Sequence, residues 1–315
     1  MSEHMRAMRQ QVLGGPEVLL PVEVERPVPG PTEVLVEVHA AGVNPVDWTV
    51  RRHGLFLTPP YTVGWDVSGV VAAVGAGVTR FQAGDEVYGM PHFPRAAGGY
   101  AEYVTAPSRH LARKPAALSH VEAAALPLAG LTAWQALVDT AGVRTGDRVL
   151  VHAAAGGVGH LAVQIAKARG AYVVATASVP RHELLRGWGA DVCVDYRTED
   201  FTAVARDMDV VLDTVGGDYE ERSLGVLRPD GLLVSIVAVF AAQRLAAKAQ
   251  AAGRRAVTLL VEPDQAGLAG IAALADGGQL KPLVAAVFPL EEAGRAHELG
   301  EGGHTAGKIV LTVAR

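Results

Sequence analysis

The chain has 315 residues, of which 50% are hydrophobic and 19% charged, a length that corresponds to two compact domains at about 150 residues each. Its 28 Lys and Arg against 33 Asp and Glu give a formal charge of −5, and neither sign forms a long block, so no nucleic-acid partner is expected. One cysteine, Cys193, excludes an internal disulfide and a zinc site built from several thiolates.

The apolar runs of the sequence are too short for a membrane protein. Residues 1–8 are polar and contain no core of signal-peptide length, and the longest strongly apolar run, residues 232–242, is about half a membrane span. We therefore expect a soluble, cytoplasmic protein without a membrane partner.

The N-terminal region, residues 11–104, consists of short β-rich runs separated by Gly and Pro. Residues 33–38 alternate in part, and residues 67–74 are almost wholly apolar. These patterns predict a compact β domain with few helices.

After about Leu126 the pattern changes to apolar strands that alternate with helical stretches, which predicts a parallel, doubly wound sheet. The expected strands are 148–153, 172–176, 192–194, 209–213, 231–237 and 258–261. Residues 241–256 are expected to form an exposed amphipathic helix. The apolar segment 232–242 is also expected to supply an edge strand to a second copy, giving a homodimer.

The C-terminal tail predicts two more strands, 284–288 and 308–313, around a helix near 291–299. Periodicity leaves open whether this tail joins the β domain or covers the parallel sheet.

A glycine-rich turn lies between the first strand and the first helix of the parallel region. It contains Gly156, Gly157, Val158 and Gly159. At this position backbone N–H groups and the N-terminus of the helix can bind a pyrophosphate. The turn therefore predicts a dinucleotide site.

The end of the second strand indicates which dinucleotide binds. NAD sites usually place an acidic residue there to bind the ribose 2′-hydroxyl, but the stretch 176–182 has no carboxylate before Glu183. Ser178 can instead donate a hydrogen bond to a 2′-phosphate, and Arg181 can pair with its charge. We therefore expect NADPH as the cofactor.

A nicotinamide cofactor limits the chemistry to hydride transfer. The 11 histidines are scattered, and no pair has the spacing of metal ligands, so no catalytic metal is expected. The hydride acceptor should then be a small molecule that is already electrophilic, such as a quinone or an enone.

Seven segments together resemble the zinc-independent quinone oxidoreductases of the medium-chain dehydrogenase/reductase superfamily. They are residues 40–47, 64–71, 99–104, 130–133, 152–159, 213–217 and 307–311. The resemblance implies an α/β fold in which a Rossmann doubly wound parallel sheet is inserted between the parts of a GroES-like β-rich domain. The implied boundaries are 1–125 for the first part of the GroES-like domain, 126–270 for the Rossmann domain and 271–315 for the returning part.

The resemblance also implies roles for individual residues. Asn44 and Asp47 correspond to a family loop beside the nicotinamide and the substrate carbonyl, and Thr132 to a residue near the nicotinamide ribose. The implied cofactor contacts are Ser178, Arg181 and Tyr196 around the 2′-phosphate, and Val215, Val237 and Val239 towards the nicotinamide end.

The sequence departs from related patterns at two places. Where zinc-dependent relatives carry metal ligands, this chain has Val43-Asn44 and Gly64-Trp65-Asp66. Where family members carry a substrate-cleft tyrosine, it has Thr49 after Trp48. Trp48 and Phe56 either stack against a flat acceptor or pack within the protein.

Two alternatives to quinone or enone reduction remain open. One is an enoyl-thioester reductase of polyketide or fatty-acid type, which uses the same scaffold and hydride geometry. The other is a regulatory protein that binds NADPH without turnover.

Overall fold

The chain forms two compact units. The computed structural model describes residues 3–313. One unit runs through Leu131 and resumes at Glu262, and the other is Thr132–Val261. An α/β insert thus interrupts a β-rich unit, as the family resemblance implied.

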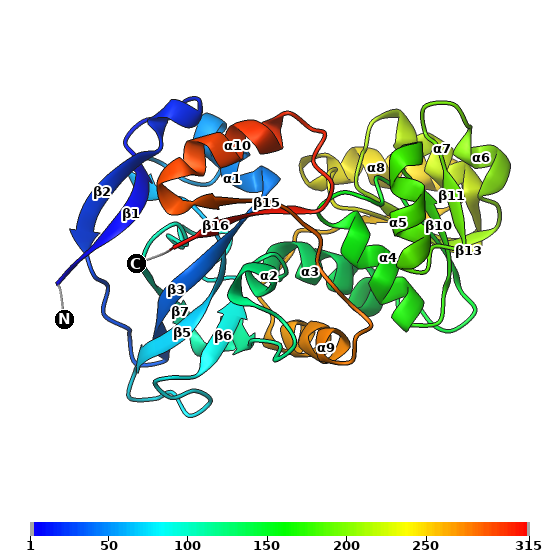
Figure 1. Ribbon diagram of the computed structural model, residues 1–315. Helices are drawn as coiled ribbons and strands as arrows, with labels where there is room; N and C mark the ends of the chain where they lie inside the picture. The colour runs from blue at the N-terminus through cyan, green and yellow to red at the C-terminus, as the bar shows by residue number, and fades with distance from the viewer. Residues whose placement is uncertain (1–2, 314–315) are drawn as a thin grey trace. The chain divides into compact units, whose positions relative to one another are not determined.

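The β-rich unit is built on a seven-stranded sheet with the order β15-β16-β3-β5-β6-β8, in which β7 also pairs with β3. Its strands are β3 (Glu33–Val43), β5 (Asp66–Val74), β6 (Glu86–Gly89), β7 (Tyr103–Pro107), β8 (Leu111–Arg113), β15 (Val284–Pro289) and β16 (Lys308–Thr312). β16 is antiparallel to β3, with Ile309 opposite Val43, so segments from the two ends of the chain lie side by side (Figure 1). The C-terminal tail therefore joins the β domain.

A smaller antiparallel sheet and several helices complete this unit. The sheet contains β1 (His4–Gln10), β2 (Leu20–Glu25) and β4 (Tyr61–Thr62). The helices are α1 (Pro45–His53), α2 (His120–Ala124), α9 (Gln265–Asp276) and α10 (Ala293–Glu301), while α3 (Pro127–Trp134) crosses the boundary between the units. The hydroxyl of Tyr88 donates to the carbonyl of Leu268 at 2.6 Å, which fastens α9 to β6.

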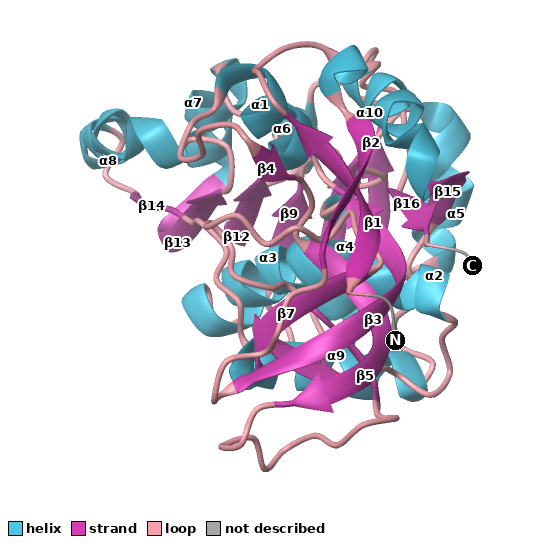
Figure 2. Ribbon diagram, turned by 90° about the vertical axis from the view of Figure 1, so that its left-hand side faces the viewer, coloured by secondary structure: helices cyan, strands magenta, loops and turns pink. Residues whose placement is uncertain are grey.

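The inserted unit is a six-stranded parallel sheet with the order β11-β10-β9-β12-β13-β14. Its strands are β9 (Arg148–Val151), β10 (Tyr172–Thr176), β11 (Val192–Val194), β12 (Met208–Asp213), β13 (Leu227–Ser235) and β14 (Arg255–Thr258). β14, β13, β12 and β9 follow one another in Figure 2. The chain order reverses between β9 and β12, which confirms the predicted doubly wound fold.

Two predictions about this sheet were wrong in detail. The last strand is Arg255–Thr258 rather than 258–261. The segment 232–242 does not supply an edge strand: its residues 232–235 end β13, which pairs with β12 on one side and with β14 on the other, and the rest follows the strand. Residues 232–234 are apolar because an internal parallel strand is buried on both faces.

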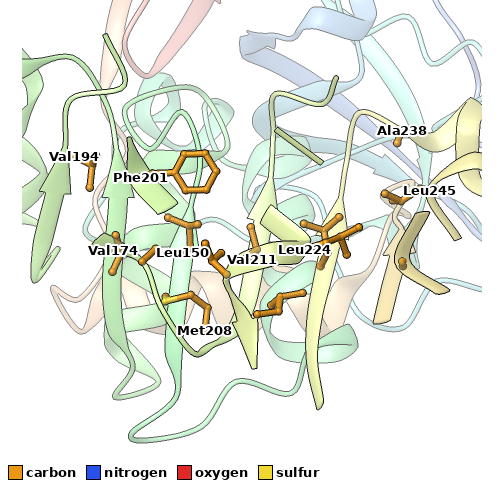
Figure 3. Close-up of a cluster of buried hydrophobic side chains, with 14 residues drawn as sticks. Leu150, Val174, Val194, Phe201, Met208, Val211, Leu224, Ala238 and Leu245 are labelled. Carbon is orange, nitrogen blue, oxygen red and sulfur yellow. The ribbon is translucent and has the colours of Figure 1, made fainter. Parts of the chain in front are cut away.

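Helices pack against both faces of the parallel sheet. They are α4 (Gly159–Ala168), α5 (His182–Gly187), α6 (Phe201–Val204), α7 (Asp218–Val226) and α8 (Ala242–Ala251). On one face, Leu150, Val174 and Val211 form a buried cluster with Phe201, Leu224 and Leu245 from α6, α7 and α8 (Figure 3). Successive side chains of a strand point to opposite faces, and α4, which is buried along most of its length, packs against β9 and β10.

No helix within residues 3–313 is long and apolar enough to cross a bilayer.

Candidate functional site

The N-terminus of α1 presents the first two predicted site residues. Asn44 follows β3 directly and occupies the N-cap position, Pro45 is the first helical residue, and Asp47 Oδ2 accepts from the backbone N–H of Asn44 at 2.7 Å. This helix was not predicted from the sequence, although an N-cap Asn, a Pro at the first helical position and an Asp two residues after it are a typical helix start.

The side chain of Asn44 lies in a buried polar cluster. Its Nδ2 donates to Asp66 Oδ2 at 2.8 Å, and its Oδ1 accepts from Lys308 Nζ. Lys308 also donates to the carbonyl of Val43 at 2.9 Å and lies 3.7 Å from Asp66 Oδ2. Asp66 Oδ1 accepts from the backbone N–H of Leu128 at 2.8 Å. The Asn44 amide is therefore surrounded by residues at the ends of three strands, β3, β5 and β16.

A directional chain of hydrogen bonds ends on Asp47. Arg51 can only donate, so Nδ1 of His297 accepts from it at 2.9 Å, and the ring proton must be on Nε2. This Nε2–H donates to the oxygen of Tyr100 at 3.1 Å, and the Tyr100 hydroxyl donates to Asp47 Oδ2 at 3.0 Å. The second terminal nitrogen of the same guanidinium, Arg51 Nη2, forms an ion pair with Glu301 at 2.8 Å. Every member of the chain thus has a fixed donor or acceptor role.

Burial controls the ionisation of these groups. Burial raises the pKa of Asp47 to about 7, against the lowering effect of the hydrogen bond from Asn44. Burial also lowers the pKa of His297 to about 3, with help from the charge of Arg51, which agrees with the neutral ring. Asp47 Oδ1 is buried and has no hydrogen-bond partner within residues 3–313.

In the inserted unit, the glycine-rich turn leads from β9 into α4. Ala153 adopts a left-handed φ of 44°, and the N–H of Gly156 donates back to its carbonyl at 2.8 Å. A Cβ on Gly159 would lie 2.4 Å from the carbonyl oxygen of Ala153, so only glycine fits there. The N–H groups of Gly157 and Val158 have no acceptor within residues 3–313, as expected of a turn that binds a pyrophosphate.

The predicted 2′-phosphate residues follow the next two strands. Ser178 is half-buried after β10, Arg181 is exposed in the 3₁₀ turn Val179–Arg181, and Tyr196 is 48% exposed after β11. β10 and β11 are parallel neighbours, with Thr176 opposite Val194. The loops that follow β10 and β11 therefore both begin at the carboxyl-terminal end of the sheet.

The remaining predicted cofactor residues follow β12 and β13, also at the carboxyl-terminal end of the sheet. Val215 and Val237 are about half exposed, and Val239 begins a 3₁₀ turn. Asp213 is buried and organises these loops: its Oδ1 accepts from the N–H groups of Val215 and Gly216 at 2.9 and 2.8 Å, and its Oδ2 accepts from Ser235 at 3.0 Å. All the predicted cofactor residues thus lie beyond the carboxyl ends of the parallel strands, where α/β sheets bind ligands.

The other predicted residues are placed as follows. Thr132 is buried near the end of α3. Trp48 packs edge-on against His297, with 6.1 Å between the ring centroids. The hydroxyl of Thr49 donates to the carbonyl of Pro45 at 2.7 Å. Phe56 is 39% exposed and packs edge-on against Trp65.

Sequence reasoning missed four residues of the Asn44 and Asp47 clusters: Asp66, Lys308, Tyr100 and His297. The first three stand inside segments that carried the family resemblance. For Asp66 and Lys308 the signal was a charged side chain at the start of an otherwise apolar strand, which must find a buried partner. His297 gave no such signal, because it lies on an amphipathic helix.

Within the described residues 3–313, no three or more His, Cys, Asp or Glu side chains are grouped so that they could hold a metal ion.

Two family models match the chain. The alcohol dehydrogenase GroES-like domain matches residues 30–116, and a zinc-binding dehydrogenase domain matches residues 188–311. A quinone oxidoreductase from Pongo abelii is 32% identical, and the match covers 98% of this chain and 97% of the relative. The chain belongs to the quinone oxidoreductase family of the medium-chain dehydrogenase/reductase superfamily, of the zinc-independent type. It is therefore an oxidoreductase that uses a nicotinamide cofactor.

Further relatives show the range of this family. An NAD(P)H oxidoreductase, mitochondrial RTN4IP1 from Danio rerio, is 32% identical over 90% of this chain and 84% of its own length. The quinone oxidoreductase structure from Coxiella burnetii has 39% identity and a TM-score of 0.93, and covers 99% of this chain and 100% of its own. The CurK enoyl reductase structure has 30% identity and a TM-score of 0.84, and covers 99% of both chains.

Proposed function

We propose that this family member is an NADPH-dependent reductase of quinones or α,β-unsaturated carbonyl compounds. The observation that carries the cofactor choice is the loop after β10, which offers Ser178 and exposed Arg181 but no carboxylate. A carboxylate there would repel a 2′-phosphate, whereas a guanidinium can bind it with two parallel hydrogen bonds.

The residues of the inserted unit fit a dinucleotide. The free N–H groups of Gly157 and Val158 would bind the pyrophosphate at the N-terminus of α4. Tyr196 would pack against the adenosine end, and Thr132 would contact the nicotinamide ribose. The backbone at Val237 and Val239 would meet the carboxamide.

When bound, NADPH supplies a hydride to the acceptor. Reduction of a quinone to a hydroquinone, or of an enone to a ketone, consumes this hydride and one proton, which we assign to water. Asn44 Nδ2 has a second N–H beyond the one that binds Asp66, and we assign it to the acceptor oxygen. Negative charge develops on that oxygen during hydride addition, and a preorganised donor stabilises it.

The cofactor proposal is tested by steady-state kinetics with NADPH and NADH on a panel of quinones and enones. Arg181→Ala should lower kcat/KM for NADPH about tenfold, the scale of one charged hydrogen bond at an exposed site, and leave the value for NADH unchanged. Arg186→Ala is the matched control, because Arg186 is also exposed but lies at the end of α5. Equal kcat/KM for the two cofactors in the unaltered protein would overturn the choice of NADPH.

An enoyl-thioester reductase is the second candidate, and the likeness to the CurK enoyl reductase supports it. Rates on enoyl thioesters against simple enones separate the two candidates. If the protein binds NADPH but turns over none of these acceptors, the regulatory alternative holds instead.

A further inference from the structure

We propose that Lys308 and Asp66 are positioning residues that fix the direction and the polarity of the Asn44 side-chain amide. This inference rests on the proposed function, in which Asn44 donates a hydrogen bond to the acceptor oxygen. It concerns a buried ion pair to which the proposed mechanism has so far given no role.

The two ends of the amide are bound by groups of opposite character. An ammonium can only donate, so Lys308 requires Oδ1 on its side of the amide. An ionised carboxylate can only accept, so Asp66 requires Nδ2 on the other side, at 2.8 Å. A flipped amide would place a donor against Lys308 and an acceptor against Asp66. The pair therefore permits one orientation of Asn44.

This arrangement leaves one amide hydrogen available. Nδ2 carries two N–H groups, one of which is engaged by Asp66, and within residues 3–313 the structure records no second acceptor for this nitrogen. The cation at Oδ1 withdraws electron density from the amide, which strengthens the remaining N–H as a donor. Lys308 thus acts on the substrate only through Asn44.

The ion pair is costly as a purely structural feature. Asp66 is fully buried, Lys308 is 3% exposed and Asn44 is 1% exposed. Charges at such positions lose their hydration, and an apolar pair of similar volume often gives equal or greater stability. Burial accordingly lowers the pKa of Lys308 and raises the pKa of Asp66, and the charge of each partner opposes the shift of the other. A role in placing Asn44 explains why charges occupy this site.

The composition of the chain allows a direct measurement of this amide. Asn44 is the only asparagine among the 315 residues, so protein labelled with ¹⁵N at asparagine side chains gives a single NH₂ signal pair. We expect the double variant Lys308→Met, Asp66→Leu, which adds no second asparagine, to shift this pair and to increase its exchange with solvent. The double variant leaves neither charge buried alone, which protects the fold.

Kinetics test whether the pair acts through Asn44. Removal of one oxyanion donor costs about 100-fold in kcat, which we expect for Asn44→Ala. The Lys308→Met, Asp66→Leu change should lower kcat about tenfold, because a misplaced group weakens transition-state binding, with KM for NADPH unchanged. In the Asn44→Ala background the same double change should lower kcat less than about twofold, because no amide remains to be positioned.

Lys114→Met is the matched control. The side chain of Lys114, also in the β-rich unit, is only 6% exposed, but it pairs with the exposed Glu86 at 3.4 Å and donates to the carbonyls of Pro115 and Leu118. This variant should move neither the asparagine signal pair nor kcat.

Two outcomes would overturn the inference: an unmoved signal pair in the double variant, or an equal fold-loss of kcat with and without Asn44. The signal pair needs no turnover. An inactive protein whose pair still shifts would therefore reject the proposed function while supporting the positioning of Asn44.

Discussion

At the residue scale, the most unusual group is Asp47. Its Oδ2 accepts from the N–H of Asn44 and the hydroxyl of Tyr100, whereas its Oδ1 is buried without a partner. An ionised carboxylate in this position lacks part of its hydration, and burial raises its pKa to about 7. Asp47 is therefore neutral at acidic pH and charged above neutrality.

This shift makes stability depend on pH. Between about pH 4 and pH 7 the folded protein retains a proton on Asp47 that the unfolded chain has lost, so the free energy of unfolding falls as pH rises. The Asp47→Asn variant has no such proton. Its free energy of unfolding relative to the wild type should therefore rise by up to about 4 kcal/mol from pH 4 to pH 7, as urea denaturation at each pH would show. A constant difference across this range would contradict the raised pKa.

Gly159 gives a second test at this scale. Gly159→Ala places a Cβ 2.4 Å from the carbonyl oxygen of Ala153 and 2.7 Å from Cα of Ala154, and both contacts are with backbone. The turn must therefore move, and we expect NADPH affinity, measured by fluorescence titration, to fall at least about tenfold.

The control is Gly225→Ala in α7, where a Cβ would meet nothing within 4 Å. This change should leave NADPH affinity unaltered and raise stability by about 0.5–1 kcal/mol. Unchanged affinity in Gly159→Ala would show that the turn does not hold the cofactor.

At the element scale, α7 and α8 are joined by a buried acid. Glu220 of α7 is 1% exposed and pairs with Arg244 of α8 at 2.8 Å and with Lys248 at 2.9 Å. The sequence predicted a solvated helix face for these cations, and their side chains are 52% and 33% exposed, but the sequence did not predict their shared partner Glu220. The helix also ends at Ala251, and Arg255 belongs to β14.

Glu220→Gln should lower the free energy of unfolding by about 1–3 kcal/mol, because two cations lose a buried partner while remaining partly solvated. Burial opposes the charge of Glu220, but its hydrogen bonds with Lys248 and Arg244 leave its pKa lowered. The stabilisation should thus be present at neutral pH and lost as pH falls below about 4.5. The exposed neighbour Glu221→Gln should change stability by less than about 0.5 kcal/mol, and an equal effect of both variants would contradict this role.

At the scale of the whole molecule, we expect a homodimer. Within residues 3–313, β14 pairs with β13 alone, and Val257 and Leu260 beside its open edge are 38% and 49% exposed. Open strand edges with apolar side chains favour pairing with another chain. Light scattering should give a mass about twice 32.8 kDa.

The Val257→Lys variant should be monomeric, since a charge on an edge strand opposes pairing. Val28→Lys is the control, because Val28 is 85% exposed in a loop of the other unit. A monomer mass for the unaltered protein would reject the dimer.

The sequence by itself determined the parallel sheet, the glycine turn and the residues after each parallel strand. These features depend on local periodicity and on turn residues, and both can be recognised in short stretches of sequence. The same local signal placed the tail strands correctly, and the family resemblance, rather than periodicity, assigned the tail to the β domain.

The tertiary structure alone decided the environment of Asn44. Its partners Asp66 and Lys308 are 22 and 264 residues away in the chain, and β16 reaches β3 only through antiparallel pairing. It likewise decided that residues 232–235, the strand part of the apolar segment, are internal in the sheet. Burial and hydrogen-bond partners result from long-range packing, and local sequence does not specify which distant segments meet.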